Sequence, residues 1–349
     1  MSKILIITYA KLGDSFILVP SLNLIKNQIP NAKIDFFSEK SSKHNLNAQY
    51  ALNATGLIDN FYFFQIDSSR VFQKVEKIYA LLKFRLKKYD YVFVLLPSSL
   101  PTKPETLKRF EKDIIFLNVK NYFIPPYISR QYKNGRLVEQ DSVMEYLFNN
   151  VSIFLQKYSP AKGSHAIEDY LYYTPGEVFS PLIRKSIGIC MGSDMPLKKW
   201  GKDNFYRVLD LIAQRYTDID FLFIGGSKQD ADEIDDLIYR LGKGKKAVNL
   251  DINFLYKQIQ QECFLYLGVD TGVMHLFNLA KIPIITIFSA RDVPGKWYPT
   301  HVPYYVFRVN IDCEGCLLYE CPIQNKCINM IESDSVFQKV EQFIHTYKK

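Results

Sequence analysis

The chain has 349 residues, of which 48% are hydrophobic and 23% are charged. This composition is typical of a globular protein of about two domains and excludes a chain that is disordered throughout. The longest apolar runs, such as residues 282–288, are far shorter than the ~20 residues of a membrane-spanning helix. The apolar run at residues 4–7 is also too short for a secretory signal, so we expect a cytoplasmic protein.

The net charge of +8 is distributed unevenly along the chain. Residues 1–180 contain 23 Lys and Arg against 16 Asp and Glu, whereas residues 181–349 contain 21 against 20. The surplus of +7 in the first half indicates either an anionic partner or a requirement for solubility.

Short β-rich runs alternate with helical patterns in the first half, which predicts a parallel sheet with crossover helices. We expect strands at residues 3–8, 33–38, 60–65, 89–96 and 113–119, and helices at residues 15–28 and 71–88. The second of these helices places apolar residues among lysines and arginines. Either it is a basic amphipathic surface helix, or it is an ordinary crossover helix with a solvated face, which is the favoured interpretation.

The second half repeats the same pattern. We expect strands at residues 186–191, 219–225, 247–250, 263–269 and 282–288, and helices at residues 202–216, 230–241, 254–262, 272–280 and 334–345. The fold class is therefore α/β, with a Rossmann-like domain at residues 1–165, another at 180–333, and a C-terminal helix at 334–349. Two such domains that face each other would place a ligand cleft at the carboxyl ends of both sheets.

The first predicted strand leads into Gly13-Asp14-Ser15 and then into a helix. This is not the G-x-G-x-x-G fingerprint, which disfavours a nicotinamide cofactor. Asp14 could act as a general base, because a carboxylate in a cleft can take a proton from a hydroxyl. Alternatively, Asp14 or Ser15 caps the helix.

The most informative junction is the segment from Asp270 to His275, where a buried strand ends and a helix begins at once. Backbone N–H groups and the helix dipole at such a start attract phosphate, and Gly272 allows it to come close. Thr271 adds a hydroxyl, and His275 lies one turn into the helix. The junction predicts diphosphate binding, whereas in the simpler alternative Asp270 and Thr271 are helix caps and His275 is a core residue.

Two further strand ends carry polar residues. Ser193 and Asp194 follow one strand and precede Lys198, whose ammonium could neutralise a leaving diphosphate or lie in an exposed basic loop. Gly226 follows another strand and suits either a nucleotide or a tight turn.

Metal ligation has two candidate patterns in this sequence. The Asp-x-Asp pairs Asp218/Asp220 and Asp230/Asp232 lie before a strand and in a helix, so we interpret them as solvated carboxylates. The spacing Cys313-x2-Cys316-x4-Cys321-x5-Cys327 is dense enough for a closed structural site holding zinc or iron, with reduced, packed thiols as the alternative. We expect no cofactor in catalysis.

In combination, these segments resemble glycosyltransferase family 9, the ADP-heptose:lipopolysaccharide heptosyltransferases. The resemblance covers nearly the whole chain in order. It rests on the motifs Leu12-Gly13-Asp14, Asp90-Tyr91-Val92-Phe93-Val94, Lys198-Lys199-Trp200, Phe223-Ile224-Gly225-Gly226 and Asp270-Thr271-Gly272-x-x-His275, followed by the four cysteines.

The resemblance implies a GT-B fold and metal-independent transfer with inversion at the anomeric carbon. It implies that Asp14 is the base and that Lys198 contacts the donor phosphates beside Ser193 and Asp194. The implied contacts to the diphosphate and sugar come from Asp270, Thr271, Gly272 and His275. The implied partners are ADP-heptose or another sugar nucleotide, an anionic lipopolysaccharide core and the cytoplasmic face of the inner membrane.

The sequence departs from the family pattern at Cys190-Met191-Gly192, where His-Pro-Gly is frequent, and near Gln229 and Asp230, where an acidic residue meets the nucleoside. Three alternatives therefore stay open: another nucleotide sugar, a protein acceptor, and a non-catalytic paralogue that binds a sugar nucleotide. A nucleic-acid partner is disfavoured, because it would account for the charge but not for the strand–helix junctions.

Overall fold

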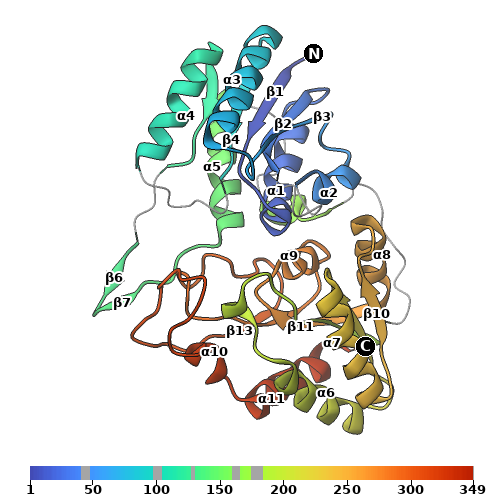
Figure 1. Ribbon diagram of the computed structural model, residues 1–349. Coiled ribbons are helices and arrows are strands. Elements are labelled where there is room, and N and C mark those ends of the chain that lie inside the picture. Colours follow the sequence, from blue (N-terminus) through green and yellow to red (C-terminus); the bar gives the residue numbers. More distant parts are fainter. Residues whose placement is uncertain (41–47, 97–103, 127–129, 159–165, 174–183, 349) are drawn as a thin grey trace. The chain divides into compact units, whose positions relative to one another are not determined.

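A computed structural model of the chain describes residues 1–40, 48–96, 104–126, 130–158, 166–173 and 184–348, with the side chains of 104–106 excepted. The chain forms two compact units (Figure 1). Unit 1 comprises Met1–Arg130 and Val143–Pro175, and unit 2 comprises Gln131–Ser142 and Gly176–Lys349. Residues 131–142, which the sequence analysis assigned to the first domain, thus group with unit 2.

Unit 1 is a five-stranded parallel sheet in the order β3-β2-β1-β4-β5. Its strands are β1 (Lys3–Ile7), β2 (Lys33–Lys40), β3 (Asn60–Gln65), β4 (Tyr91–Val94) and β5 (Asn121–Phe123). Its helices are α1 (Leu12–Gln28), α2 (Ala48–Leu52), α3 (Arg70–Lys87), α4 (Pro104–Leu117) and α5 (Val143–Tyr158). Helix α1 packs against α2 and α5, whereas α3 packs against α4 and β3, so the sheet is covered on both faces (Figure 1).

The strand predicted at residues 113–119 is wrong, because residues 113–117 form the end of α4 and the last two residues follow the helix. The run from Ile114 to Leu117 is apolar enough to resemble a buried strand. However, Phe110, Ile114 and Leu117 are the buried residues, at the spacing of one helix face. The last strand of this sheet is β5, which follows the helix.

Unit 2 is a six-stranded parallel sheet in the order β10-β9-β8-β11-β12-β13. Its strands are β8 (Ser186–Cys190), β9 (Asp220–Gly225), β10 (Lys245–Val248), β11 (Cys263–Val269), β12 (Ile284–Ile287) and β13 (Tyr304–Phe307). Its helices are α6 (Lys202–Arg215), α7 (Lys228–Leu241), α8 (Ile252–Glu262), α9 (Gly272–Leu279), α10 (Lys326–Asn329) and α11 (Ser333–Tyr347). A short antiparallel hairpin, β6 (Tyr132–Lys133) with β7 (Arg136–Leu137), also belongs to this unit.

The C-terminal helix α11 is part of the core of unit 2. It packs against α6 and β11 and buries Val336, Val340 and Ile344 in the same cluster as Trp200. The indole of Trp200 donates a hydrogen bond to the backbone oxygen of Ile331 (3.0 Å), just before this helix begins. Strand β13, which the sequence analysis missed, has mostly exposed or half-buried residues at the edge of the sheet.

Helix α9 lies very close to the sheet, and a glycine in β8 permits this. A Cβ atom added to Gly188 would lie 2.2 Å from Cζ of Phe277, which is too close for any non-bonded carbon pair. The second half of α9 is therefore packed directly against the middle of β8. No helix within the described residues is long and apolar enough to cross a membrane.

Candidate functional site

The order of the strands in unit 2 places two of the predicted loops side by side. Strands β8 and β11 are hydrogen-bonded neighbours, and the chain winds away from them in opposite directions along the sheet. Ligands of doubly wound sheets bind beyond the carboxyl ends of the strands at this switch point. The loop after β8 contains Ser193, Asp194 and Lys198, and the residue after β11 is Asp270.

An ion pair joins these two loops. The Nζ atom of Lys198 lies 2.6 Å from Oδ2 of Asp270, and both side chains are largely buried, with 17% and 9% of their surface exposed. Lys198 ends a short 3-10 turn, Pro196–Lys198, and Asp270 lies directly before Thr271, the N-cap of α9. The structure therefore brings together the predicted lysine, the predicted aspartate and the helix start at one place.

His275 lies in the first turns of α9 and is buried. Burial lowers the pKa of its imidazole to about 4; the charge of Asp270 opposes this shift and that of Lys198 adds to it. The imidazole is therefore neutral near pH 7. A neutral ring can both donate and accept a hydrogen bond, so it supplies polarity here without adding charge to the ion pair.

This pKa predicts a pH dependence of stability. The pKa in the folded state, about 4, is below the ordinary value of ~6.5, so the unfolded state binds more protons and stability falls as the pH drops through this interval. Because His275 takes up a proton in the unfolded state, we expect the free energy of unfolding to fall by about 2 kcal/mol from pH 7 to pH 5. Urea unfolding of the wild type and of His275→Gln at both pH values checks this. The glutamine does not titrate, so the variant should lack this part of the pH dependence. An equal pH dependence in the wild type and the variant would contradict the prediction.

The loop after β8 is held by the segment that carries the cysteines. The hydroxyl of Tyr319 donates to the backbone oxygen of Asp194 (3.1 Å), and the Asn325 amide donates to that of Pro196 (3.2 Å). Ser193 accepts a hydrogen bond from the backbone N–H of Met195 through its Oγ (3.2 Å), which shapes the turn before Lys198. The sequence analysis did not predict this support, because Tyr319 and Asn325 lie far along the chain.

Gly226 and Asp230 take part in a helix cap. Oδ2 of Asp230 accepts the backbone N–H groups of Gly226 and Ser227, each at 3.0 Å, and Oγ of Ser227 accepts the N–H of Asp230. Asp230 also lies against the end of β8, since a Cβ atom on Gly192 would be 2.5 Å from its Oδ1. The N–H of Gly226 is thus already engaged in the cap of α7.

In unit 1, Gly13 and Asp14 lie in the first turn of α1, after the carboxyl end of β1. Oδ2 of Asp14 accepts the backbone N–H of Lys11 (3.1 Å), so this carboxylate caps the helix start, with Lys11 rather than Asp14 or Ser15 as the N-cap residue. Glu39, near the end of the neighbouring strand β2, was missed by the sequence analysis. Burial raises the pKa of Glu39; the charge of Lys11 opposes the shift and that of Asp14 adds to it.

The two Asp-x-Asp pairs lie at opposite ends of β9: Asp218 and Asp220 at its amino end, and Asp230 beyond its carboxyl end, close to Gly192 of the loop after β8. Asp220 is the first residue of β9, and Asp218 forms an ion pair with Lys348. Asp232 lies within α7, whose cap includes Asp230.

The metal site predicted from the four cysteines is not assembled in the structure. Across the described ranges, no group of three or more His, Cys, Asp or Glu side chains is placed to hold a metal ion. Cys313 is exposed, Cys316 and Cys321 are half-buried, and the buried Cys327 accepts the backbone N–H of Ala290 through Sγ (3.4 Å). Burial raises the pKa of the Cys313 thiol, and the charges of the other three thiols add to this shift.

A charged cluster after β12 was also missed by the sequence analysis. Asp292 accepts a hydrogen bond from the Trp297 indole (2.8 Å), and its Oδ1 lies 3.5 Å from Nζ of Lys296. Nearby, the buried Arg308 pairs with Glu314 (3.0 Å) and donates to the backbone oxygen of Asp292. In the sequence, only the position of these residues could have identified them: the cluster follows the carboxyl end of β12, and β12 is the neighbour of β11 in the sheet.

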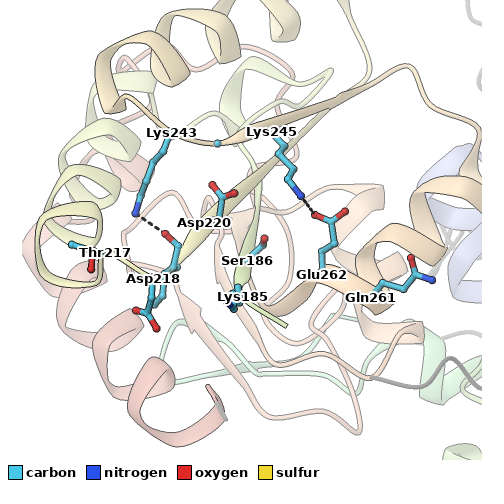
Figure 2. A pocket seen from close by; sticks show the side chains of 11 residues that line it. Lys185, Ser186, Thr217, Asp218, Asp220, Lys243, Lys245, Gln261 and Glu262 are labelled. Carbon is cyan, nitrogen blue, oxygen red and sulfur yellow. Dashed lines mark hydrogen bonds and ion pairs between the residues drawn. The ribbon is translucent and has the colours of Figure 1, made fainter. Parts of the chain in front are cut away.

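A cavity in unit 2 lies at the opposite edge of the sheet (Figure 2). Its lining includes Ser186, Asp220 and Lys245, which are the first residues of β8, β9 and β10. Lys245 points to Glu262, at 2.8 Å, and Lys243 donates to the backbone oxygen of Ile219 (Figure 2). These charges are paired locally, and the cavity is at the amino ends of the strands rather than at the switch point.

Comparison with known proteins gives a consistent result. The family model described as glycosyltransferase family 9 (heptosyltransferase) matches residues 144–327. A lipooligosaccharide heptosyltransferase 2 of Campylobacter jejuni is 24% identical over 178 residues, which are 47% of this chain and 54% of that protein. The chain thus spans about half the length of this curated relative.

Two solved structures share the fold over nearly their full lengths. A glycosyl transferase family 9 protein from Veillonella parvula has a TM-score of 0.65 at 16% identity, with 99% of this chain and 97% of that chain covered. The E. coli heptosyltransferase WaaC with ADP has a TM-score of 0.63 at 15% identity, with 98% and 99% covered. The predicted α/β class and GT-B fold with two Rossmann-like domains are confirmed.

Proposed function

This chain belongs to glycosyltransferase family 9, and we propose that it transfers a heptose from ADP-heptose to a hydroxyl of inner-core lipopolysaccharide. The observation that carries the proposal is the Lys198–Asp270 ion pair at the switch point of unit 2. The names of the similar proteins, a lipooligosaccharide heptosyltransferase and a heptosyltransferase with ADP, supply the choice of donor and acceptor.

Unit 2 binds the donor in this proposal. The diphosphate lies at the start of α9, where the backbone N–H groups of the first turn and the hydroxyl of Thr271 can donate to its oxygens. Lys198 supplies positive charge, and Asp270 holds the ammonium in place before the donor binds. His275, Ser193 and Asp194 complete the pocket around the sugar and phosphates.

Unit 1 activates the acceptor. Asp14 takes the proton from the acceptor hydroxyl as its oxygen attacks the anomeric carbon of the heptose. The new C–O bond forms on the face opposite the diphosphate, the bond from that carbon to the phosphate oxygen breaks, and ADP leaves with the bonding electrons. Inversion at the anomeric carbon follows from this single displacement.

The charge that develops on the leaving ADP is met by Lys198 and the dipole of α9, a role that a divalent cation has in other transferases. In this proposal the cysteine segment has a structural role rather than a part in the reaction. The cysteine segment contributes by holding the loop of Lys198, through Tyr319 and Asn325.

The second candidate function is transfer of a different sugar, or transfer to a protein. It is favoured by Asp230, because the acidic residue expected to meet the nucleoside accepts the N–H groups of Gly226 and Ser227 instead. A non-catalytic paralogue would bind the sugar nucleotide without turnover.

The test is ADP release by the purified protein with ADP-heptose and truncated core lipopolysaccharide, combined with calorimetric measurement of ADP binding. Turnover that requires both substrates is the expected result. Donor binding without turnover would point to another acceptor or a non-catalytic protein. A protein that binds neither ADP nor ADP-heptose would overturn the proposal.

A further inference from the structure

Helix α3 exposes a set of large apolar side chains that a crossover helix normally buries. The buried side chains on the helix are those of Lys77, Leu81 and Phe84. Seven apolar or aromatic residues are instead exposed, including Val71 at 72% and Leu86 at 84%: Val71, Phe72, Val75, Ile78, Tyr79, Leu82 and Leu86. The solvated face expected from the sequence is therefore apolar.

These seven residues form one continuous face. At about 100° per residue, they fall within roughly 120° of the helix circumference, and the buried residues lie on the other side. The orientation of the helix is determined by its contacts. Lys77 forms an ion pair with Asp113 of α4 (2.7 Å), and Leu81 and Phe84 pack in the core of unit 1.

Positive charge lies along both edges of this apolar face. Residues 70–88 contain seven Lys and Arg and one Glu, a net charge of +6, whereas all of residues 1–180 have 23 basic and 16 acidic side chains, a net of +7. Lys74 and Arg85 lie at one edge of the apolar face and Lys83 at the other, and all three are exposed. Lys77 and Lys87 are paired with Asp113 and Asp35, so the charge beside the apolar face comes from the other basic residues of this segment.

We propose that α3 is a membrane-docking surface, which inserts its apolar face into the headgroup region of an anionic lipid bilayer. A continuous apolar face flanked by lysines and arginines is the pattern of an interfacial helix. Charge complementarity selects the occupant, because lysines and arginines close to an anionic bilayer are attracted to its negative surface. An apolar protein partner would gain little from the flanking charges.

The docking surface is argued from α3 itself. Only the identity of the membrane, the one that carries the lipopolysaccharide acceptor, rests on the proposed function. Docking through α3 would hold unit 1, with Asp14, near a lipid-anchored acceptor. The two proposals can fail separately, because vesicle binding is measured without donor or acceptor.

The test is flotation of the full chain with vesicles of phosphatidylcholine, with and without phosphatidylglycerol. We expect binding to the anionic vesicles, weakened by added salt. The double variant Val75→Glu/Leu82→Glu should lower the partition coefficient at least about tenfold, because it places two charges in the apolar face. Both positions are exposed, so the fold should persist. Tyr239→Glu, at an exposed position on α7 of unit 2, is the matched control and should bind as the wild type does.

Three results would overturn the inference: no binding of the wild type to anionic vesicles, equal binding by the double variant, or a wild-type dimer that the double variant abolishes. The last would show that a second copy of the chain covers this face. Turnover with a detergent-solubilised acceptor should be unchanged in the double variant. If the wild type binds the vesicles but shows no turnover, the proposed function is contradicted and the membrane-docking inference is not.

Discussion

Replacing Asp14 by Asn is expected to lower kcat by a factor of about 10²–10⁴, the usual contribution of a general base. The affinity for ADP should be unchanged, because the proposal places the donor on unit 2. Initial rates of ADP release with both substrates, together with calorimetry of ADP binding, check the two halves of this prediction.

The structure adds a complication, because Asp14 also accepts the backbone N–H of Lys11. An Asn side chain keeps an oxygen that can accept this bond, so thermal stability should change little. A large loss of stability with a proportionate loss of rate would assign Asp14 to the helix cap alone.

Glu39 provides the matched control. Its carboxyl group is near enough to Asp14 for the charge of Asp14 to raise its pKa, although burial is the larger cause. If Asp14 is the base, Glu39→Gln should retain most of the activity. If Glu39→Gln is the inactive variant and Asp14→Asn is active, the base has been assigned to the wrong carboxylate.

Replacing Lys198 by Met is expected to reduce both stability and turnover. The substitution leaves the carboxylate of Asp270 buried without its counter-ion, a change that costs about 3–5 kcal/mol in buried pairs. The same variant loses the cation proposed to meet the diphosphate, so we expect at least about a tenfold weaker affinity for ADP. Urea unfolding and calorimetry measure the two effects.

The double variant Lys198→Met/Asp270→Asn separates these two effects. It removes both charges, so most of the lost unfolding free energy should return. ADP affinity and turnover should stay low, because the cation is still absent. Recovery of ADP binding in the double variant would show that Lys198 only neutralises Asp270 and has no part in holding the diphosphate.

The local sequence predicted five strands and five helices of unit 2, and four strands and two helices of unit 1; it missed α2, α4 and α5. Buried parallel strands such as β1 and β11 are apolar along their length, and the helices between them have a clear period, so both are visible in short windows. The same windows failed at residues 113–119, where an apolar run is compatible with either a strand or one face of α4. They also failed at β13, whose exposed residues lack the pattern of a buried strand.

The candidate site was predicted as separate pieces. Lys198 and Asp270 each follow a strand, and a doubly wound sheet brings such loops to one edge, so their approach was implied by the topology. The ion pair between them, the cap that engages Gly226, and the cluster of Asp292 and Lys296 depend on side-chain packing between distant segments. The spacing of the four cysteines likewise did not reveal that Cys327 turns inward while Cys313 is exposed.

Helix α3 marks the limit most clearly. Its sequence determined an amphipathic, basic helix, because the positions of apolar and charged residues around a helix follow from a fixed turn per residue. Its sequence did not determine which face would be buried. The tertiary structure decided this through the pairing of Lys77 with Asp113 and the packing of Phe84, contacts that involve other elements of unit 1. Local pattern thus specifies the faces of an element, whereas the energy of contacts between elements selects the face that water or a partner meets.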